Sequence, residues 1–297
     1  MNGSRWMLLG APWDCSGAAR GERDAPEALR RAGLAALVER DLGDAVTVVD
    51  STRRDAGTGV LALPETVRAA RALTGALGAA LGDRPGRRPL VLGGDCSLLL
   101  GVVPALRREV GPVGLWFVDG HPDYADGRSS DTGETADMDL AILTGDGAAP
   151  LVTLAGEPPM VAVDDVVLLG HRARDLDEAA AAELARVPDG LRRIDADAVA
   201  RDPAAAGARA AEWLSGSGAG GWLHVDLDVL DPATLPAVSY PQPGGLDWTQ
   251  LAELLAPLAR SPRLLGVSIA DYRPDLDPTG EHAARITSMI EASLMSS

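Results

Sequence analysis

Residues 113–123, which read Val-Gly-Leu-Trp-Phe-Val-Asp-Gly-His-Pro-Asp, combine the two features that decide the fold and the chemistry of this chain. The apolar run 113–118 is typical of a strand buried on both faces of a parallel sheet. Side chains at i, i+2 and i+4 of an extended segment point to one side, so Asp119, His121 and Asp123 can converge on one point. The segment therefore predicts a buried strand with a polar site at its carboxyl end.

Similar short apolar runs alternate along the chain with longer stretches that have apolar residues at helical spacing. This alternation predicts βαβ units, a parallel sheet and a single α/β domain over residues 1–297. We expect strands at 6–9, 46–49, 90–92, 113–118, 166–169, 191–194, 222–227 and 264–269. We expect helices at 26–39, 65–81, 98–108, 138–143, 176–186, 203–214, 248–258 and 282–294. We interpret the Gly- and Ser-rich segment 215–221 as a surface loop.

The composition excludes several classes of protein. All 27 basic residues are Arg, so enzymes that need a Schiff-base lysine, a P-loop lysine or a kinase lysine are excluded. With 43 acidic residues the net charge is -16, and aromatic residues are only 3% of the chain, which argues against a nucleic-acid partner. We find neither an apolar run long enough for a membrane span nor a signal-peptide core, and we therefore expect a cytoplasmic protein without a membrane partner.

Two further motifs follow expected strands. Residues 93–97 read Gly-Gly-Asp-Cys-Ser, and residues 224–228 read His-Val-Asp-Leu-Asp. Asp226 and Asp228 share one side of their strand and would repel each other unless a cation neutralised them. Each motif alone could equally be a helix cap or a turn. Together the three motifs offer carboxylates, an imidazole and a thiol, which suits one or two ions such as Mn²⁺.

The three motifs resemble the signatures of the ureohydrolase family, which comprises arginases, agmatinases and their relatives. The signatures read Gly-Gly-Asp-His-Ser, Asp-Ala-His-x-Asp and Ser-x-Asp-x-Asp-x-x-Asp-Pro, and this chain has GGDCS at 93–97, DGHPD at 119–123 and HVDLDVLDP at 224–232. The resemblance extends from Gly10-Ala11-Pro12 to the last expected helix. It implies a three-layer α/β/α fold with a central, mainly parallel sheet of about eight strands, as in arginases and deacetylases. It also implies a homo-oligomer, either a trimer or a hexamer.

The resemblance implies a binuclear manganese centre with six ligands. These are Cys96, Asp119, His121, Asp123, Asp226 and Asp228. Asp119 and Asp226 would bridge the two ions, with Cys96 and Asp123 on one ion and His121 and Asp228 on the other. A hydroxide that bridges the ions and is held by Asp123 would attack the guanidino carbon of a small substrate.

Cys96 departs from the family pattern because most members have a histidine there. A thiolate is softer than imidazole and carries a charge, so it binds Mn²⁺ less typically and leaves a single bound ion possible. The alternative is a buried cysteine that binds no metal. A cysteine at this position is similar to the N-hydroxyarginine amidinohydrolase of the same family.

Another departure concerns the proton donor. Ala136 stands where arginases have a histidine that shuttles protons to the leaving amine, and Glu134 or His224 are the candidate substitutes. Ser130 and Thr132 fall where the family places hydroxyls near the substrate α-carboxylate.

Three acids align with family residues that contact the substrate. Asp175 and Glu178 align with acids that face the α-amino group, although acids at a helix N-terminus are an equally good interpretation. Asp271 replaces the glutamate that pairs with the guanidinium and is one methylene shorter.

These observations predict a metal-dependent amidinohydrolase that cleaves a guanidino C–N bond of an arginine-like or N-substituted substrate such as N-hydroxyarginine. The alternative, suggested by Cys96 and Ala136, is a non-hydrolytic or single-metal family member that keeps the fold but only binds or regulates. A deacetylase would need its own His-rich motif, and the sequence has none.

Overall fold

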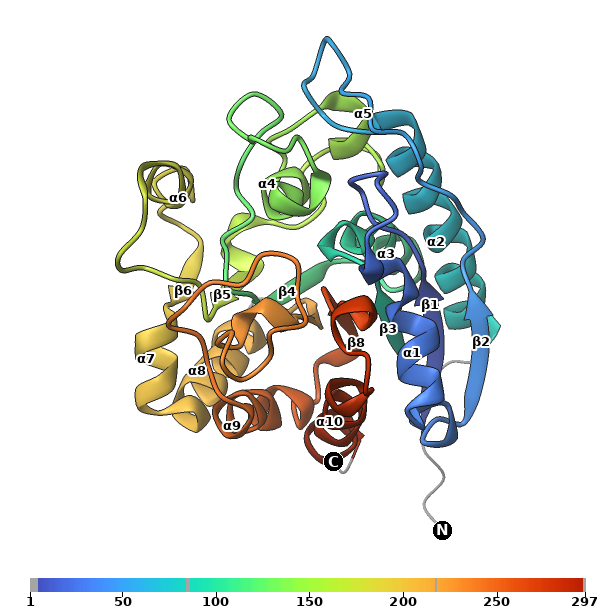
Figure 1. The fold of residues 1–297 in the computed structure, drawn as a ribbon, viewed down its shortest axis with the longest axis vertical. Coiled ribbons are helices and arrows are strands. Elements are labelled where there is room, and N and C mark those ends of the chain that lie inside the picture. The colour runs from blue at the N-terminus through green and yellow to red at the C-terminus, as the bar shows by residue number, and fades with distance from the viewer. Residues whose placement is uncertain (1–4, 84–85, 217, 296–297) are drawn as a thin grey trace.

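The computed structural model describes residues 5–83, 86–216 and 218–295, and at its centre these residues form one parallel sheet of eight strands (Figure 1). The strands are β1 (Trp6–Ala11), β2 (Arg40–Asp44), β3 (Arg88–Gly93), β4 (Val113–Val118), β5 (Val166–Leu169), β6 (Arg192–Ile194), β7 (Gly220–Asp226) and β8 (Leu264–Ala270). Their order in the sheet is β2-β1-β3-β8-β7-β4-β5-β6, and all neighbours are parallel. The predicted α/β fold is confirmed.

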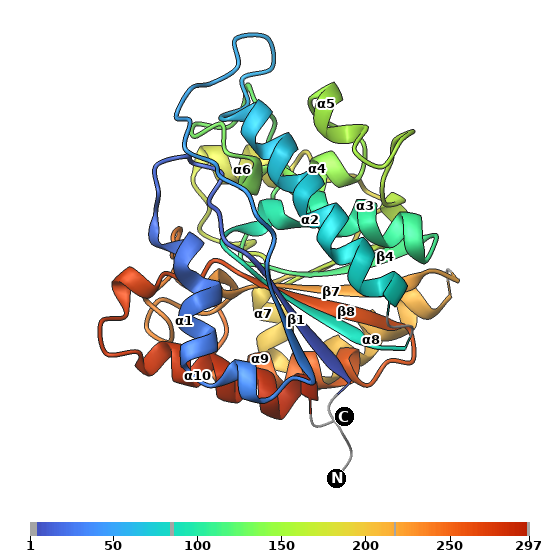
Figure 2. The same cartoon turned by 90° about the vertical axis from the view of Figure 1, so that its right-hand side faces the viewer.

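Helices cover both faces of the sheet and complete the three layers (Figure 2). One face carries α2 (Leu63–Asp83), α3 (Leu99–Glu109), α4 (Asp139–Leu143), α5 (Ala149–Val152) and α6 (Glu178–Leu184). The other carries α1 (Ala25–Arg31), α7 (Ala196–Arg201), α8 (Pro203–Ser215), α9 (Trp248–Ala259) and α10 (Glu281–Ile290). In the described part of the chain, no helix combines the length and apolar character that a membrane crossing requires.

The alternation of side chains along β4 shows why both faces of the sheet are apolar. Leu115 and Phe117 pack into the core that includes α2 and α3, whereas Trp116 and Val118 pack into the core on the opposite face. All four side chains are completely buried. A strand that contributes to two cores at once has no polar positions until it ends, so the polar residues of the motif begin at Asp119.

The strand order brings the ends of four strands together. After β3 the chain passes through α3 and forms β4, but β3 and β4 are not neighbours in the sheet. Two strands from later in the sequence, β8 and β7, lie between them. The carboxyl ends of β3, β8, β7 and β4 therefore lie side by side, which is where open parallel sheets place their ligand sites.

The predicted strand at 46–49 is wrong. The edge strand β2 lies earlier, over Arg40–Asp44, and its charged, mostly exposed side chains give no apolar signal. Val46 is 93% exposed, so its β-branched side chain does not mark a buried strand.

Helix ends also differ from the prediction. The helix expected at 26–39 ends at Arg31, because Gly33 adopts a left-handed conformation with φ of 104°. The helix expected at 282–294 is α10 followed by a π-helical turn over Glu291–Met295. Helices α5 and α7, of four and six residues, were not predicted because their sequences show no clear apolar period. Within the predicted loop 215–221, Ser217 lies outside the described residues.

Candidate metal centre and substrate pocket

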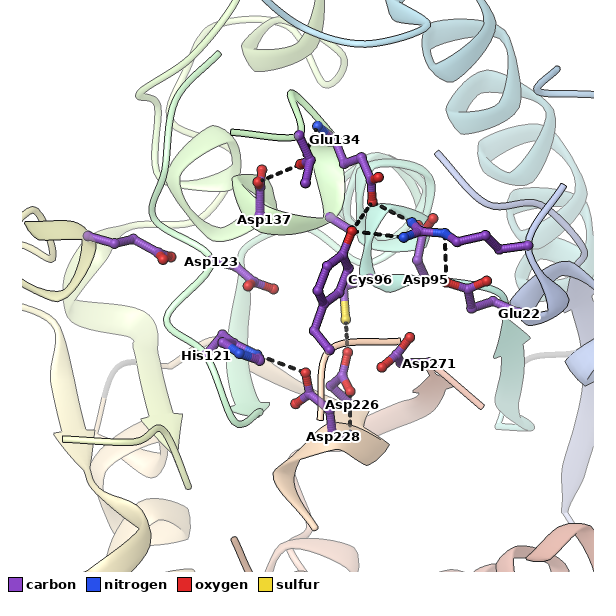
Figure 3. A pocket seen from close by; sticks show the side chains of 15 residues that line it. Glu22, Asp95, Cys96, His121, Asp123, Glu134, Asp137, Asp226, Asp228 and Asp271 are labelled. Carbon is purple, nitrogen blue, oxygen red and sulfur yellow. Dashed lines mark hydrogen bonds and ion pairs between the residues drawn. The ribbon is translucent and has the colours of Figure 1, made fainter. Parts of the chain in front are cut away.

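All six candidate metal ligands lie together at the carboxyl ends of β3, β4 and β7, and five of them are labelled in Figure 3. The Cys96 Sγ lies 2.6 Å from Asp226 Oδ2 and 3.8 Å from Asp119 Oδ2. On the other side of the cluster, His121 Nδ1 lies 2.8 Å from Asp228 Oδ2. Residues from positions 96 to 228 thus meet in one group, as the spacing of the motifs predicts.

The backbone around Cys96 is held by a glycine and an aspartate. A Cβ atom on Gly94 would lie 1.7 Å from the carbonyl oxygen of Trp13, so only glycine fits this turn. The carboxylate of Asp95 accepts hydrogen bonds from the backbone N–H groups of Ser97 and Cys15. This tight turn points Cys96 toward the cluster from β3.

Hydrogen bonds to the backbone also fix the acids of β7. Asp226 Oδ1 accepts the backbone N–H of Asp228 at 2.7 Å, and Asp228 Oδ1 accepts the backbone N–H of Gly120 at 2.9 Å. The second bond ties the loop after β7 to the loop after β4. Each carboxylate keeps a second oxygen that faces the cluster, since Asp226 Oδ2 is near Cys96 and Asp228 Oδ2 is near His121.

Two acids at the site have a left-handed backbone. Asp123 has a φ of 47° and Asp271 a φ of 65°, and both side chains are buried. A non-glycine residue in this conformation costs free energy and persists only where the surroundings enforce it, which is common at functional sites. The fold therefore holds both carboxylates against a local conformational preference.

The electrostatics of the cluster favour added positive charge. Burial raises the pKa of Asp119, Asp123 and Asp226 well above the usual value for aspartate, and neighbouring carboxylates raise it further. Burial acts in the same direction on Asp228, but His121 beside it lowers the pKa of Asp228 overall. The cluster thus holds more negative charge than its imidazole can balance.

An orphaned carboxylate supports the fit of these residues to metal ions. Asp139 is completely buried, and neither of its carboxylate oxygens has a hydrogen-bond partner among the described residues. Ligand atoms of Cys96, Asp123 and Asp139 all lie within 4.8 Å of one another. A buried carboxylate without a partner is costly unless a cation compensates it, so this donor set fits divalent cations.

A pocket opens from this cluster to the surface, and several of its residues were not predicted. The walls include Arg20, Glu22, Asp137, Glu183 and Tyr240. The Arg20 guanidinium pairs with the Glu134 carboxylate, and Arg20 Nη1 donates to Tyr240 Oη at 2.8 Å. Arg20 and Glu22 come from the loop after β1, and the carboxyl end of this strand was a signal that could have identified them.

Glu22 and Asp271 share a hydrogen-bond partner, Ser239. Its side chain is completely buried, and Glu22 Oε1 accepts the hydroxyl of Ser239. The backbone N–H of the same serine donates to Asp271 Oδ2 at 3.1 Å. Burial raises the pKa of Asp271, and the charges of Asp228 and Glu22 raise it further. Ser239 therefore links two carboxylates in one wall of the pocket.

Several predicted substrate residues lie at the pocket and others do not. Thr132, Glu134, Ala136 and Asp271 line it. The hydroxyls of Ser130 and Thr132 both donate to Asp137, so they are not free donors toward a substrate. Burial raises the pKa of this aspartate to about 6.

Four predicted substrate or catalytic residues, Ser130, Asp175, Glu178 and His224, do not line the pocket wall. Asp175 and Glu178 are exposed, because the loop before α6 runs outward and Asp177 caps that helix at the surface. Glu183, which lies five residues after Glu178 in α6, lines the pocket instead. His224 is completely buried and lies behind Cys96, so it does not face a substrate directly.

Comparisons with known proteins agree with this geometry. The sequence matches the profile of the arginase family over residues 4–297. It is 30% identical to an arginase from Brevibacillus brevis over 98% of this chain and 96% of the relative. The fold matches the native structure of Bacillus caldovelox arginase with a TM-score of 0.87, at 25% identity and 98% coverage of both chains. Formimidoylglutamase from Bacillus subtilis, at 20% identity and a TM-score of 0.77, shares the fold over 97% of this chain and 85% of its own.

Fold, site and matches together define the class as hydrolases that act on C–N bonds of linear amidines. The chain belongs to the arginase family, because the family profile spans nearly its whole length and the relative of 30% identity covers 98% of it. The family predicted from the three motifs is confirmed.

Proposed function

We propose that this chain hydrolyses a guanidino C–N bond of an arginine-like amino acid. The preferred substrate carries an N-substituted guanidino group, such as that of N-hydroxyarginine. One observation carries the proposal. The buried acid cluster lies in a pocket, and one wall of this pocket holds two carboxylates, Glu22 and Asp271, that are linked through Ser239. A planar cationic head group is the natural occupant of such a wall. We infer a cytoplasmic enzyme that forms trimers or hexamers, as the resemblance to arginases implies.

Cys96, Asp119, His121, Asp123, Asp226 and Asp228 are the residues that would hold two Mn²⁺ ions. Bound divalent ions supply Lewis-acid charge that makes water a nucleophile near neutral pH. In our proposal, Asp123 orients the attacking water and accepts its proton. Its carboxylate is buried at the pocket, and its strained backbone limits the positions that the side chain can take.

Recognition of the guanidino head falls to Asp271 and Glu22. Asp271 is one methylene shorter than the glutamate of the family pattern, and Glu22 adds a second carboxylate in the same wall. Glu22 Oε2 is buried and has no hydrogen-bond partner among the described residues, although Arg273 Nε lies 3.8 Å from it and Arg20 Nε lies 3.4 Å from Oε1 as ion pairs. Two acceptors of this kind suit a guanidino group that carries an additional N–OH donor.

The amino-acid end of the substrate would meet the outer part of the pocket. Arg20 lines the pocket beside Glu22 and Glu134, and it is our candidate for binding the α-carboxylate. Glu183 is our candidate for the α-ammonium group, since its carboxylate lines the same pocket. These two residues take the role that the sequence assigned to Ser130, Thr132, Asp175 and Glu178.

Protonation of the leaving group needs a substitute for the histidine that Ala136 replaces. Asp137 is our candidate, because it lines the pocket and its Oδ1 is buried without a partner among the described residues. A carboxyl group with a pKa of about 6 is able to release a proton near neutral pH. Glu134, the earlier candidate, is held by Arg20 and Tyr240 and is better suited to fixing that arginine.

The test is a panel of guanidino compounds incubated with the Mn²⁺-loaded protein. We expect hydrolysis of N-hydroxyarginine to ornithine and hydroxyurea to be faster than hydrolysis of arginine to ornithine and urea, and agmatine to be the poorest of the three. Asp123→Asn should abolish turnover while the protein stays folded. Full metal loading without hydrolysis of any compound would contradict the proposal and favour a member that only binds or regulates.

A further inference from the structure

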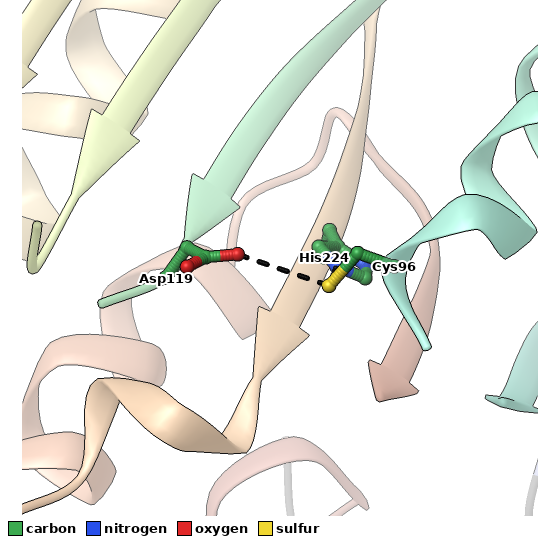
Figure 4. A group of neighbouring side chains, drawn as sticks. All are labelled: Cys96, Asp119 and His224. Carbon is green, nitrogen blue, oxygen red and sulfur yellow. Dashed lines mark hydrogen bonds between the residues drawn. The ribbon is translucent and has the colours of Figure 1, made fainter. Parts of the chain in front are cut away.

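His224 occupies a position that no part of the proposed mechanism uses. It lies on β7, its side chain is completely buried, and its Nε2 is 3.0 Å from Cys96 Sγ (Figure 4). The family signatures have histidine where this chain has Cys96, and serine where it has His224. The two departures from the family pattern are therefore in direct contact, although 128 positions separate them.

The imidazole is held in one orientation by its neighbours. Its Nδ1 lies 2.8 Å from Ser268 Oγ on β8, and the same hydroxyl oxygen accepts Trp222 Nε1–H at 2.9 Å. The Phe117 ring packs against the imidazole with 5.2 Å between ring centroids. With Nδ1–H donating to Ser268, the Nε2 lone pair faces the cluster, which is the arrangement typical of metal-ligating histidines.

A third ligand atom completes the group. Ligand atoms of Cys96, Asp119 and His224 lie within 4.8 Å of one another, and all three residues are buried. Figure 4 shows the carboxylate of Asp119 pointing toward the Cys96 sulfur, with His224 beside Cys96. The group offers sulfur, nitrogen and oxygen from three different strand ends.

We propose that His224 supplies an imidazole ligand to the metal on the Cys96 side of the centre. The imidazole that position 96 lacks is then relocated to position 224, and Cys96 adds a thiolate to it. A thiolate and an imidazole also bind a borderline ion such as Co²⁺ well, which makes Co²⁺ a suitable probe of this position. The inference rests on the proposed metal centre but is independent of the substrate and of turnover.

The test uses metal-free full-length protein titrated with Co²⁺ alone. Bound Co²⁺ reports a thiolate ligand through a charge-transfer band in the near ultraviolet, and its visible bands report the coordination of the ion. We expect the wild-type protein to bind Co²⁺ with a thiolate band. His224→Ser should weaken Co²⁺ binding at this position at least about 10-fold and change the visible bands.

Two further variants complete the comparison. Cys96→His combined with His224→Ser restores the family pattern and should recover affinity without the thiolate band. His171→Asn removes another buried histidine, which lines a separate hollow beside α6, and should leave Co²⁺ binding unchanged. Co²⁺ binding by His224→Ser with the affinity and spectrum of the wild type would overturn the inference and leave the proposed function intact.

A measurement on the wild-type protein guards against a variant that fails to fold. With ¹⁵N-labelled histidine, pulsed EPR of the Co²⁺-loaded protein counts the imidazole nitrogens bound to metal. We expect two, from His121 and His224, and a count of one would overturn the inference. Failure to bind Co²⁺ or Mn²⁺ at all would contradict the inference and the proposed metal centre together.

Discussion

Asp226→Asn separates the two roles of the buried acids, because it is expected to change stability in opposite directions with and without metal. Asp226 is buried in the cluster, and burial together with Asp228 and Asp119 raises its pKa. The substitution removes the charge but keeps an oxygen that can accept the backbone N–H of Asp228, now at 2.7 Å. The metal-free variant should therefore be more stable than the metal-free wild type by about 1–3 kcal/mol, the scale of the desolvation penalty of a buried polar group, because it removes a buried charge that has carboxylates as neighbours.

Metal ions reverse the order. At a Mn²⁺ concentration 100 times the dissociation constant, each occupied site stabilises the wild type by about 2.7 kcal/mol. The variant lacks a carboxylate that we assign to both ions, so its gain at the same concentration should be close to zero. The wild type then becomes the more stable protein when metal is present.

Urea unfolding of chelator-treated and Mn²⁺-loaded samples measures both effects. Asp164→Asn is a matched control, since Asp164 is exposed and the substitution should change neither curve appreciably. If Asp226→Asn destabilised the metal-free protein and left the gain from Mn²⁺ unchanged, Asp226 would be a structural acid and our account of the cluster would be refuted.

Three further predictions concern residues around the cluster. Glu22→Gln should raise KM for the preferred guanidino substrate about 10-fold or more without changing the metal content, and steady-state kinetics with an unchanged KM would argue against a role for Glu22 in binding. Arg172→Lys should lower the free energy of unfolding by about 2–3 kcal/mol, since the guanidinium donates to carbonyl oxygens of residues 228–230 and Gln242; urea unfolding measures the loss, and a variant as stable as the wild type would contradict it. Burial lowers the pKa of His171 to about 4, so the unfolded chain, with an ordinary value of about 6.5, takes up the proton first as the pH falls. The wild type should therefore lose about 2 kcal/mol between pH 7 and pH 5 that His171→Asn does not lose, and parallel pH profiles of the two proteins would refute this explanation.

The sheet could be predicted wherever a strand is buried on both faces. The boundaries of β4 and β5 agree with the prediction to the residue, because Pro112 and Asp119 bound the first apolar run and Asp165 and Gly170 bound the second. The edge strand β2 could not be found in this way. It pairs with only one neighbour, its side chains are mostly exposed, and no apolar pattern is needed to hold it.

Part of the candidate site could also be predicted from the sequence. In the motifs 119–123 and 224–228 the ligands lie a few residues apart after one strand, so the sequence predicts that they lie near one another. The path between them was not predicted, because β4 ends at Val118 and Asp123 adopts a φ of 47°. Glu22 and Tyr240 reach the pocket from distant loops, and their contribution depends on the order of strands in the sheet. Asp175 and Glu178 were assigned to the substrate because an alignment gives no information on the path of the loop before α6.

The most direct test of the metal centre is the anomalous X-ray scattering of crystals of this protein grown with Mn²⁺ and measured at the manganese absorption edge. Our account predicts two anomalous peaks in the cluster, one within bonding distance of Cys96 Sγ and the other within bonding distance of His121 and Asp228. Crystals that contain Mn²⁺ in solution but show no anomalous peak among these side chains would contradict it.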